Sequence, residues 1–136
     1  MAGIIKNREL IGYLNSLSGF NDESGTIVCK GFKNELVTLG TKVRLNKIEK
    51  ELIKHYQEFE EAKKLKIKEV YPDGITREIE EEEIKTNSEQ YTKLITELTE
   101  CGEDTVTLEF EKIQLSKVED LVTLFDYSYL LELISE

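Results

Sequence analysis

A proline-free stretch from Phe32 to Val70 constrains this chain more than any other feature of its sequence. The stretch is rich in Lys, Glu and Leu, whose side chains lose little rotamer freedom in a helix. A helix over these residues would span roughly 60 Å at about 1.5 Å per residue, far beyond the usual length of a globular helix. The other segments are shorter, so they have to pack against this rod or extend from its ends.

The apolar residues of this stretch change sides near Gly40. With successive residues about 100° apart around a helix, two apolar stripes appear. The first stripe contains Phe32, Leu36, Leu39 and Val43, and the second contains Leu45, Ile48, Leu52, Tyr56, Phe59 and Ala62. Either the helix breaks at Gly40, with the glycine as its C-terminal cap, or one continuous rod buries its two halves against different neighbours. We expect the break.

The second stripe, called the seam below, also follows a heptad pattern with His55 at its polar position. Two heptads are too short to establish a coiled coil, so we expect a helix hairpin within the chain. The natural antiparallel partner is an amphipathic helix over residues 87–100. That helix is shorter than the rod and covers only part of the seam. An exposed apolar stripe is usually an interface, so we expect a homo-oligomer or a place in a larger assembly.

Shorter elements are expected on both sides of the rod. The sequence indicates strands at 3–6, 26–29 and 105–110, helices at 8–17 and 117–134, and a hairpin that joins 68–71 to 75–79. Asn7 is an expected N-cap, and Thr86 and Ser116 are expected to open capping boxes. The prediction is a single domain over residues 1–136 with an α+β, mainly α fold. In that fold the long central helix packs in hairpin fashion with shorter helices, beside a small β element.

Charge is distributed unevenly along the chain. Residues 1–70 carry 13 Lys and Arg against 10 Asp and Glu, residues 71–136 carry 5 against 18, and the net charge is −10. We expect the acidic half to fold back on the basic helix. The alternative is an acidic surface that engages a basic partner or occupies a nucleic-acid site by mimicry. Direct binding of nucleic acid is not expected, because phosphate contacts need a clustered basic face.

Residues that could carry chemistry are sparse. His55 is the single histidine, and Cys29 and Cys101 lie far apart without a CxxC motif, so neither a zinc site nor a disulfide framework is indicated. The glycines form neither GxGxxG nor a P-loop. The run Glu80–Glu83 lacks the Gly and Asp positions of a calcium loop and is interpreted as a solvated face. We therefore expect no catalytic residue, no cofactor and no metal.

Three aromatic residues near the C-terminus, Phe125, Tyr127 and Tyr129, allow two interpretations. They close the core, which we favour, or they form an interface patch. With the seam they make up the full set of interface candidates, which is Leu45, Ile48, Leu52, Phe59, Phe125, Tyr127 and Tyr129.

The order of these elements resembles that of small uncharacterised proteins of tailed bacteriophages. The matching segments are Asn7-Arg8-Glu9-Leu10, Leu14-Asn15-Ser16-Leu17, the helix Leu45–Lys68, the loop Asp73-Gly74, and the helix and strand Gln90–Gln114. The glutamate run and the strand at 26–29 depart from the pattern. The resemblance implies a phage-encoded, non-enzymatic protein from the virion-structure or tail-assembly genes, and it brings no catalytic residues.

The expected function is therefore binding to other phage proteins or to itself, as a virion-associated or assembly accessory protein. The alternative is an acidic anti-defence or host-takeover inhibitor that blocks a host nucleic-acid-binding protein. The sequence has no run of 18 apolar residues and no secretory signal pattern, so no membrane span is expected. The expected location is the host cytoplasm during synthesis, with the virion as the destination of an assembly protein.

Overall fold

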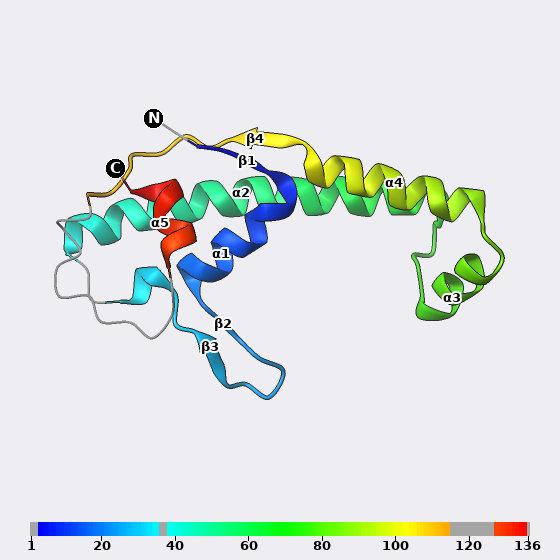
Figure 1. Ribbon diagram of the computed structural model, residues 1–136, viewed down its shortest axis with the longest axis horizontal. Coiled ribbons are helices and arrows are strands. Elements are labelled where there is room, and N and C mark those ends of the chain that lie inside the picture. Colours follow the sequence, from blue (N-terminus) through cyan, green and yellow to red (C-terminus); the bar gives the residue numbers. More distant parts are fainter. Residues whose placement is uncertain (1–2, 36–37, 115–126, 136) are drawn as a thin grey trace.

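The computed structural model describes residues 3–35, 38–114 and 127–135 (Figure 1). It has an α+β, mainly α fold, as the sequence predicts. The elements in chain order are β1 (Ile4–Lys6), η1 (Asn7–Glu9), α1 (Leu10–Ser18), β2 (Phe20–Asn21), β3 (Ile27–Cys29), η2 (Phe32–Asn34), α2 (Leu39–Val70), α3 (Arg77–Lys85), α4 (Glu89–Glu103), β4 (Thr105–Thr107) and α5 (Ser128–Ile134). Figure 1 shows α2 as the axis of an elongated molecule, with α4 along its C-terminal half and α3 near its far end.

The long helix α2 runs through Gly40 without interruption, so the expected break at Gly40 is wrong. The helix begins just upstream, where the side chain of Thr38 accepts a hydrogen bond from the backbone N–H of Thr41 at 3.3 Å. A threonine cap satisfies an orphan donor of the first turn and fixes the start of the helix there. Gly40 therefore lies in the first turn rather than at a C-terminus.

The two predicted apolar stripes of α2 differ in how deeply they are buried. In the seam, Leu45, Ile48 and Leu52 are fully buried, while Ala62 is exposed. In the first stripe Leu39 is 81% exposed, so it does not bury against a second neighbour as expected. Leu36 lies outside the described residues. The helix therefore buries one stripe, which ends at Phe59.

The core forms mainly where α1 crosses α2. Four apolar residues of α1 stand at i, i+3, i+4 and i+7, which places them on one face, and all four are buried: Leu10, Tyr13, Leu14 and Leu17. They join the seam, η2, α5 and two residues after β4 in one cluster. The seam is thus covered within the chain chiefly by α1, and not left to a second copy as the sequence suggested. At its other end α2 pairs with α4, which confirms the expected helix hairpin.

Two small antiparallel sheets complete the fold. Strand β1 pairs with β4, and Ile5 lies opposite Val106. Strand β2 pairs with β3 in a hairpin. The predicted hairpin at 68–71 and 75–79 is wrong, because α2 continues to Val70 and Thr76 caps α3 by accepting from the N–H of Ile79 at 3.2 Å. Glutamates in the first turn of α3 also favour a helix, since they complement its dipole.

Two expected caps are replaced by neighbouring residues. Ser88, and not Thr86, caps α4 by accepting from the N–H of Tyr91 at 3.2 Å. The Thr86 hydroxyl instead donates to a carbonyl of α3 and ends that helix. Asn7 caps no helix, and its side chain donates to the Cys101 carbonyl at 2.9 Å. The expected capping box at Ser116 lies outside the described residues.

Candidate protein-binding groove

The far part of the molecule, residues 60–100, is called the arm below. It consists of the end of α2, α3 and most of α4, and it extends beyond the core (Figure 1). Within it only Leu94 is buried, with 1% of its surface exposed. An ion pair of 2.8 Å between Lys66 and Glu97 links the two long helices of the arm. Helices of this kind depend on tertiary packing for stability, and an arm with one buried side chain has little packing of its own.

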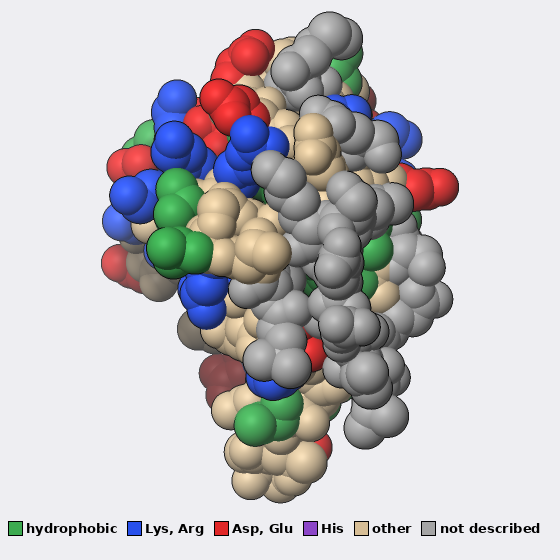
Figure 2. Space-filling model, turned by 90° about the vertical axis from the view of Figure 1, so that its left-hand side faces the viewer, with side chains coloured by type: hydrophobic (Ala, Val, Ile, Leu, Met, Phe, Trp, Pro, Cys, Tyr) green, Lys and Arg blue, Asp and Glu red, His purple; other side chains and the backbone are tan. Residues whose placement is uncertain are grey.

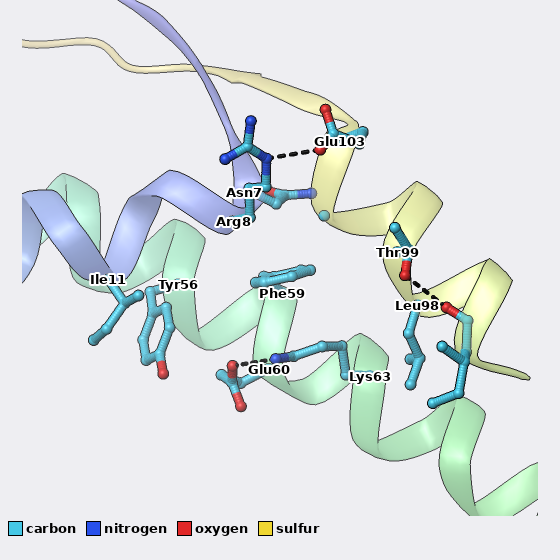
Figure 3. Close-up of a pocket in the computed structure, with 12 residues that line it drawn as sticks. Asn7, Arg8, Ile11, Tyr56, Phe59, Glu60, Lys63, Leu98, Thr99 and Glu103 are labelled. Carbon is cyan, nitrogen blue, oxygen red and sulfur yellow. Dashed lines mark hydrogen bonds and ion pairs between the residues drawn. The ribbon is translucent and has the colours of Figure 1, made fainter. Parts of the chain in front are cut away.

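A groove of about 570 Å³ lies where the arm joins the core, between α1, α2 and α4 (Figure 3). Its apolar lining consists of Ile11, Tyr56, Phe59, Ile95 and Leu98. Ile11 and Ile95 are 42% and 40% exposed, and together with the other lining residues they form an apolar patch. The groove thus exposes apolar side chains from three different helices to solvent.

The charged groups at the groove are paired with one another. Arg8 Nε lies 2.7 Å from a Glu103 carboxylate oxygen, and Lys63 Nζ lies 2.7 Å from a Glu60 carboxylate oxygen, as the dashed lines in Figure 3 show. Hydrogen bonds from Lys6 and Arg8 lower the pKa of Glu103 below its usual value. Lys63 also lies over the ring of Phe59, 4.6 Å from its centroid. Because each cation has a carboxylate partner, the groove presents little net charge and suits an apolar ligand surface.

The outward face of α4 beside the groove carries no charge. It is formed by Thr92, Ile95, Thr96 and Thr99, at helical spacing. The hydroxyls of Thr96 and Thr99 donate to backbone carbonyls of the same helix at 2.9 and 2.8 Å, which leaves their methyl groups to form the surface. Ile95 also lines a second hollow of about 250 Å³ with the 57% exposed Ile84. The uncharged surface therefore continues from the groove towards α3.

The predicted interface residues do not form this surface. Leu45, Ile48 and Leu52 are fully buried, so as interface candidates they are corrected to core residues, and Phe59 is the one interface candidate from the seam that lines the groove, beside Tyr56. The physical reason is that α1 covers the seam. Sequence reasoning missed Ile11 and Ile95, although the stripe on residues 87–100 is wider than one helix contact needs.

The C-terminal aromatic residues Tyr127 and Tyr129 lie in different environments, one buried and one exposed. Tyr127 is buried at 4% exposure, as the favoured core interpretation predicts, and its hydroxyl donates to Glu35 at 3.2 Å. Tyr129 is 52% exposed and stacks on Tyr13. Phe125 lies outside the described residues. This region therefore closes the core and leaves Tyr129 at the surface.

The residues considered for chemistry are held in structural contacts. His55 Nε2 lies 3.1 Å from a Glu51 oxygen of its own helix. Cys29 is buried with its sulfur 3.9 Å from the Tyr127 hydroxyl, and Cys101 is half-buried on α4. Among the described residues, no group of three His, Cys, Asp or Glu side chains is placed to hold a metal ion.

No family model matches the chain, and neither a curated protein nor a solved structure matches it. In the described ranges, every helix is too short or too polar to cross a membrane. The arm and its groove therefore have to be interpreted from their own geometry.

Proposed function

We propose that this chain is a non-enzymatic protein that acts by binding other proteins, with the groove as the docking site for an amphipathic helix. The observation that carries the proposal is the arm, which buries Leu94 alone and yet exposes apolar side chains beside the core. Exposed apolar surface of this kind marks sites of protein contact.

A helix suits the groove better than an extended peptide. The lining comes from helices, and a third helix placed along α2 and α4 would complete a three-helix arrangement with a buried interior. An extended peptide needs a free strand edge for its backbone hydrogen bonds, and α2 and α4 offer none. The paired charges at Arg8 and Lys63 leave the apolar face of the ligand as the main source of affinity.

The proposed setting is a tailed bacteriophage, in which the chain would be a virion-associated or assembly accessory protein. This part of the proposal is supported by the resemblance of the segments Asn7–Leu10, Leu14–Leu17 and Leu45–Lys68 to small phage proteins. The partners would be other phage proteins. Synthesis would take place in the host cytoplasm and the final location would be the particle.

The test is incorporation into particles with one changed side chain in the groove. Ile95→Glu places a charge in the groove, and Ile53→Glu is the matched control because Ile53 is an exposed α2 residue outside the groove. Mass spectrometry of purified particles is expected to find the wild-type chain and the Ile53 variant at stoichiometric copy number, and to find the Ile95 variant strongly reduced. Equal incorporation of all three chains contradicts the groove as docking site. Absence of the wild-type chain contradicts the virion-associated role.

A second candidate function is the acidic inhibitor. It is favoured by the exposed carboxylates of α3, which are those of Glu78, Glu80, Glu81 and Glu82. They lie near the far end of the arm, away from the core (Figure 1), where a nucleic-acid-binding protein could reach them. This candidate needs the partner to be basic and its binding to depend on salt.

A further inference from the structure

The hairpin of β2 and β3 projects from the body of the protein (Figure 1). Ile27 is 67% exposed and Val28 is 48% exposed, while Phe20 on the other strand is 37% exposed. In Figure 2, which keeps the vertical direction of Figure 1, hydrophobic side chains appear on the lowest, protruding part of the molecule. Exposed β-branched residues indicate a strand whose sequence favours sheet formation, and such strands are sites of pairing between chains.

The base of the hairpin is held in one position by Gly19 and Gly31, because the two backbone segments that contain them pack directly against each other. Gly19 and Gly31 have φ values of +91° and +94°. A Cβ on Gly19 would lie 2.4 Å from the Lys30 carbonyl oxygen, and a Cβ on Gly31 would lie 2.4 Å from the Ser18 carbonyl carbon. Asn34 fastens the same point by donating to the Lys30 carbonyl at 2.8 Å. The hairpin is therefore presented to solvent in a defined direction.

Within residues 3–35, 38–114 and 127–135, no strand lies beside the outer edge of β3. Among the described residues this sheet contains two strands, and β3 pairs with β2 alone. A strand edge leaves backbone N–H and C=O groups open to a further strand. The edge carries Ile27 and Val28, because the N–H and C=O groups of Thr26 already bond to Asp22. It has no proline or lysine between Thr26 and Cys29, which are residue types that block strand edges in many proteins.

Charges at the two ends of β3 select the partner and its direction. The tip carries Asp22 and Glu23, and Lys30 is exposed at the other end of the strand. If a second copy of β3 lies antiparallel, Lys30 of each copy comes beside the acidic tip of the other. A parallel arrangement would instead place the two acidic tips together, which like charges disfavour. The strand is therefore complementary to itself in the antiparallel direction.

We propose that β3 is the self-association edge of this protein, pairing antiparallel across a twofold axis with β3 of a second copy to form a four-stranded sheet. The contact lies on a different surface from the groove and leaves the groove open. Because a three-residue strand buries little area, we expect a weak, transient dimer that is populated only at high protein concentration.

Sedimentation of the purified chain between roughly 10 and 500 µM tests the proposal, since such a dimer changes population over this range. The wild-type protein is expected to shift from monomer to dimer. Ile27→Lys places a charge at the edge and is expected to keep the protein monomeric, while its circular dichroism and thermal unfolding stay unchanged because Ile27 is exposed. Ile95→Glu, in the groove, is expected to dimerise like the wild type. A wild-type monomer at the highest concentration overturns the proposal.

A charge reversal tests the direction of pairing. Lys30→Glu turns attraction into repulsion at two symmetric places and is expected to weaken the dimer about tenfold. Adding Glu23→Lys to that variant is expected to restore it. A dimer that survives Ile27→Lys, or one that Lys30→Glu does not weaken, overturns the antiparallel β3 contact.

Cross-linking locates the axis. Ile27→Cys and Val28→Cys are expected to give, in at least one case, a disulfide-linked dimer on mild oxidation, because facing residues near a twofold axis come within the Cβ separation that a disulfide needs. Ile53→Cys, an exposed position on α2, is the matched control and is expected to stay monomeric, as is the wild type with its own Cys29 and Cys101. Failure of both strand variants to cross-link overturns the proposal.

Discussion

The ring of Tyr13 lies parallel to the ring of Tyr129, with centroids 4.7 Å apart and planes inclined by 8°. The Tyr129 hydroxyl also donates to Glu9 at 2.5 Å. The bond to Glu9 joins residues 120 positions apart in sequence, and the two contacts together attach α5 to η1 and α1. Tyr129 therefore serves to hold the C-terminal helix in place although it is half exposed.

This contact predicts a pH dependence of stability. Hydrogen bonding to Glu9, and then to Tyr13, raises the pKa of Tyr129 above its usual value of 10.0, and the bond from Tyr129 lowers the pKa of Glu9 below 4.5. The raised pKa of Tyr129 contributes stability that is present below pH 10 and is lost as pH rises beyond it. The lowered pKa of Glu9 contributes stability that is lost as pH falls below 4.5. Tyr129→Phe is expected to lower the free energy of unfolding by about 1 kcal/mol between these limits, since a half-exposed bond to a charged group is screened.

Urea unfolding of the wild type and of Tyr129→Phe from pH 3 to pH 11 measures this difference, over roughly the range in which both groups titrate. The gap between the two chains is expected to close at both extremes. A constant gap across the whole range would show that the hydroxyl does not contribute through Glu9.

The base of the β2–β3 hairpin predicts unequal effects at two glycines with similar backbone angles. Gly31 has φ +94° and its Cβ position is occupied by backbone atoms of Ser18 and Gly19, whereas Gly25 has φ +86° and open space around it. Gly31→Ala is expected to destabilise the protein by about 3 kcal/mol, from strain and from the clash, and Gly25→Ala by about 1 kcal/mol, from strain alone.

Thermal unfolding of both alanine variants measures the two costs. Equal destabilisation would mean that the backbone angle alone matters and that the hairpin base yields to a side chain. That outcome would also weaken the argument that the hairpin is presented in a fixed direction.

The two stripes of α2 make a third prediction. Leu52 is fully buried in the core and Leu39 is 81% exposed, although both belong to apolar stripes in the sequence. Leu52→Ala is expected to cost about 2–5 kcal/mol, because it removes buried surface and leaves a cavity. Leu39→Ala is expected to change the free energy of unfolding by less than about 0.5 kcal/mol. Denaturant unfolding compares them, and a similar cost at both positions would mean that Leu39 is covered.

Periodicity identified the parts of the fold that depend on a local pattern. The buried faces of α1 and of the seam consist of apolar residues at helical spacing, although the sequence placed the seam at an interface and not in the core. The mainly helical α+β fold and the α2–α4 hairpin follow in the same way. These patterns succeed because one apolar face per element has to be covered.

Sequence reasoning failed where two local signals compete or where burial depends on distant segments. Glycine commonly ends helices, which favours a break at Gly40, but the Thr38 cap two residues earlier decides where α2 begins. Residues 75–79 have some strand character, but Thr76 and the glutamates after it favour a helix. Most of the seam is covered by α1 and not by α4, and this arrangement depends on tertiary packing between distant segments. For that reason the sequence could not distinguish core residues such as Ile48 from groove residues such as Ile95.

The glutamate run separates the two candidate functions. Replacing Glu80–Glu83 by glutamine removes four charges from α3 and keeps residues that support a helix. Glu83 accepts from the Tyr71 hydroxyl at 2.7 Å, a bond that a glutamine side chain can also accept, so α3 is expected to stay attached to the end of α2. The other three carboxylates are exposed.

If binding uses the uncharged groove, this change is expected to leave the association rate and the dissociation constant for the particle partner within about twofold of wild type, since rim charges mainly affect steering. If the chain is an acidic inhibitor, association is expected to slow markedly, and the wild-type rate is expected to fall as salt rises from about 0.05 to 0.5 M, where the screening length shortens severalfold. Stopped-flow or surface binding of both chains over that salt range measures the difference. We expect binding within about twofold of wild type, because the affinity comes from the apolar lining of Phe59, Ile95 and Leu98, which neither salt nor the α3 charges change. A large, salt-dependent loss would instead assign the partner surface to α3.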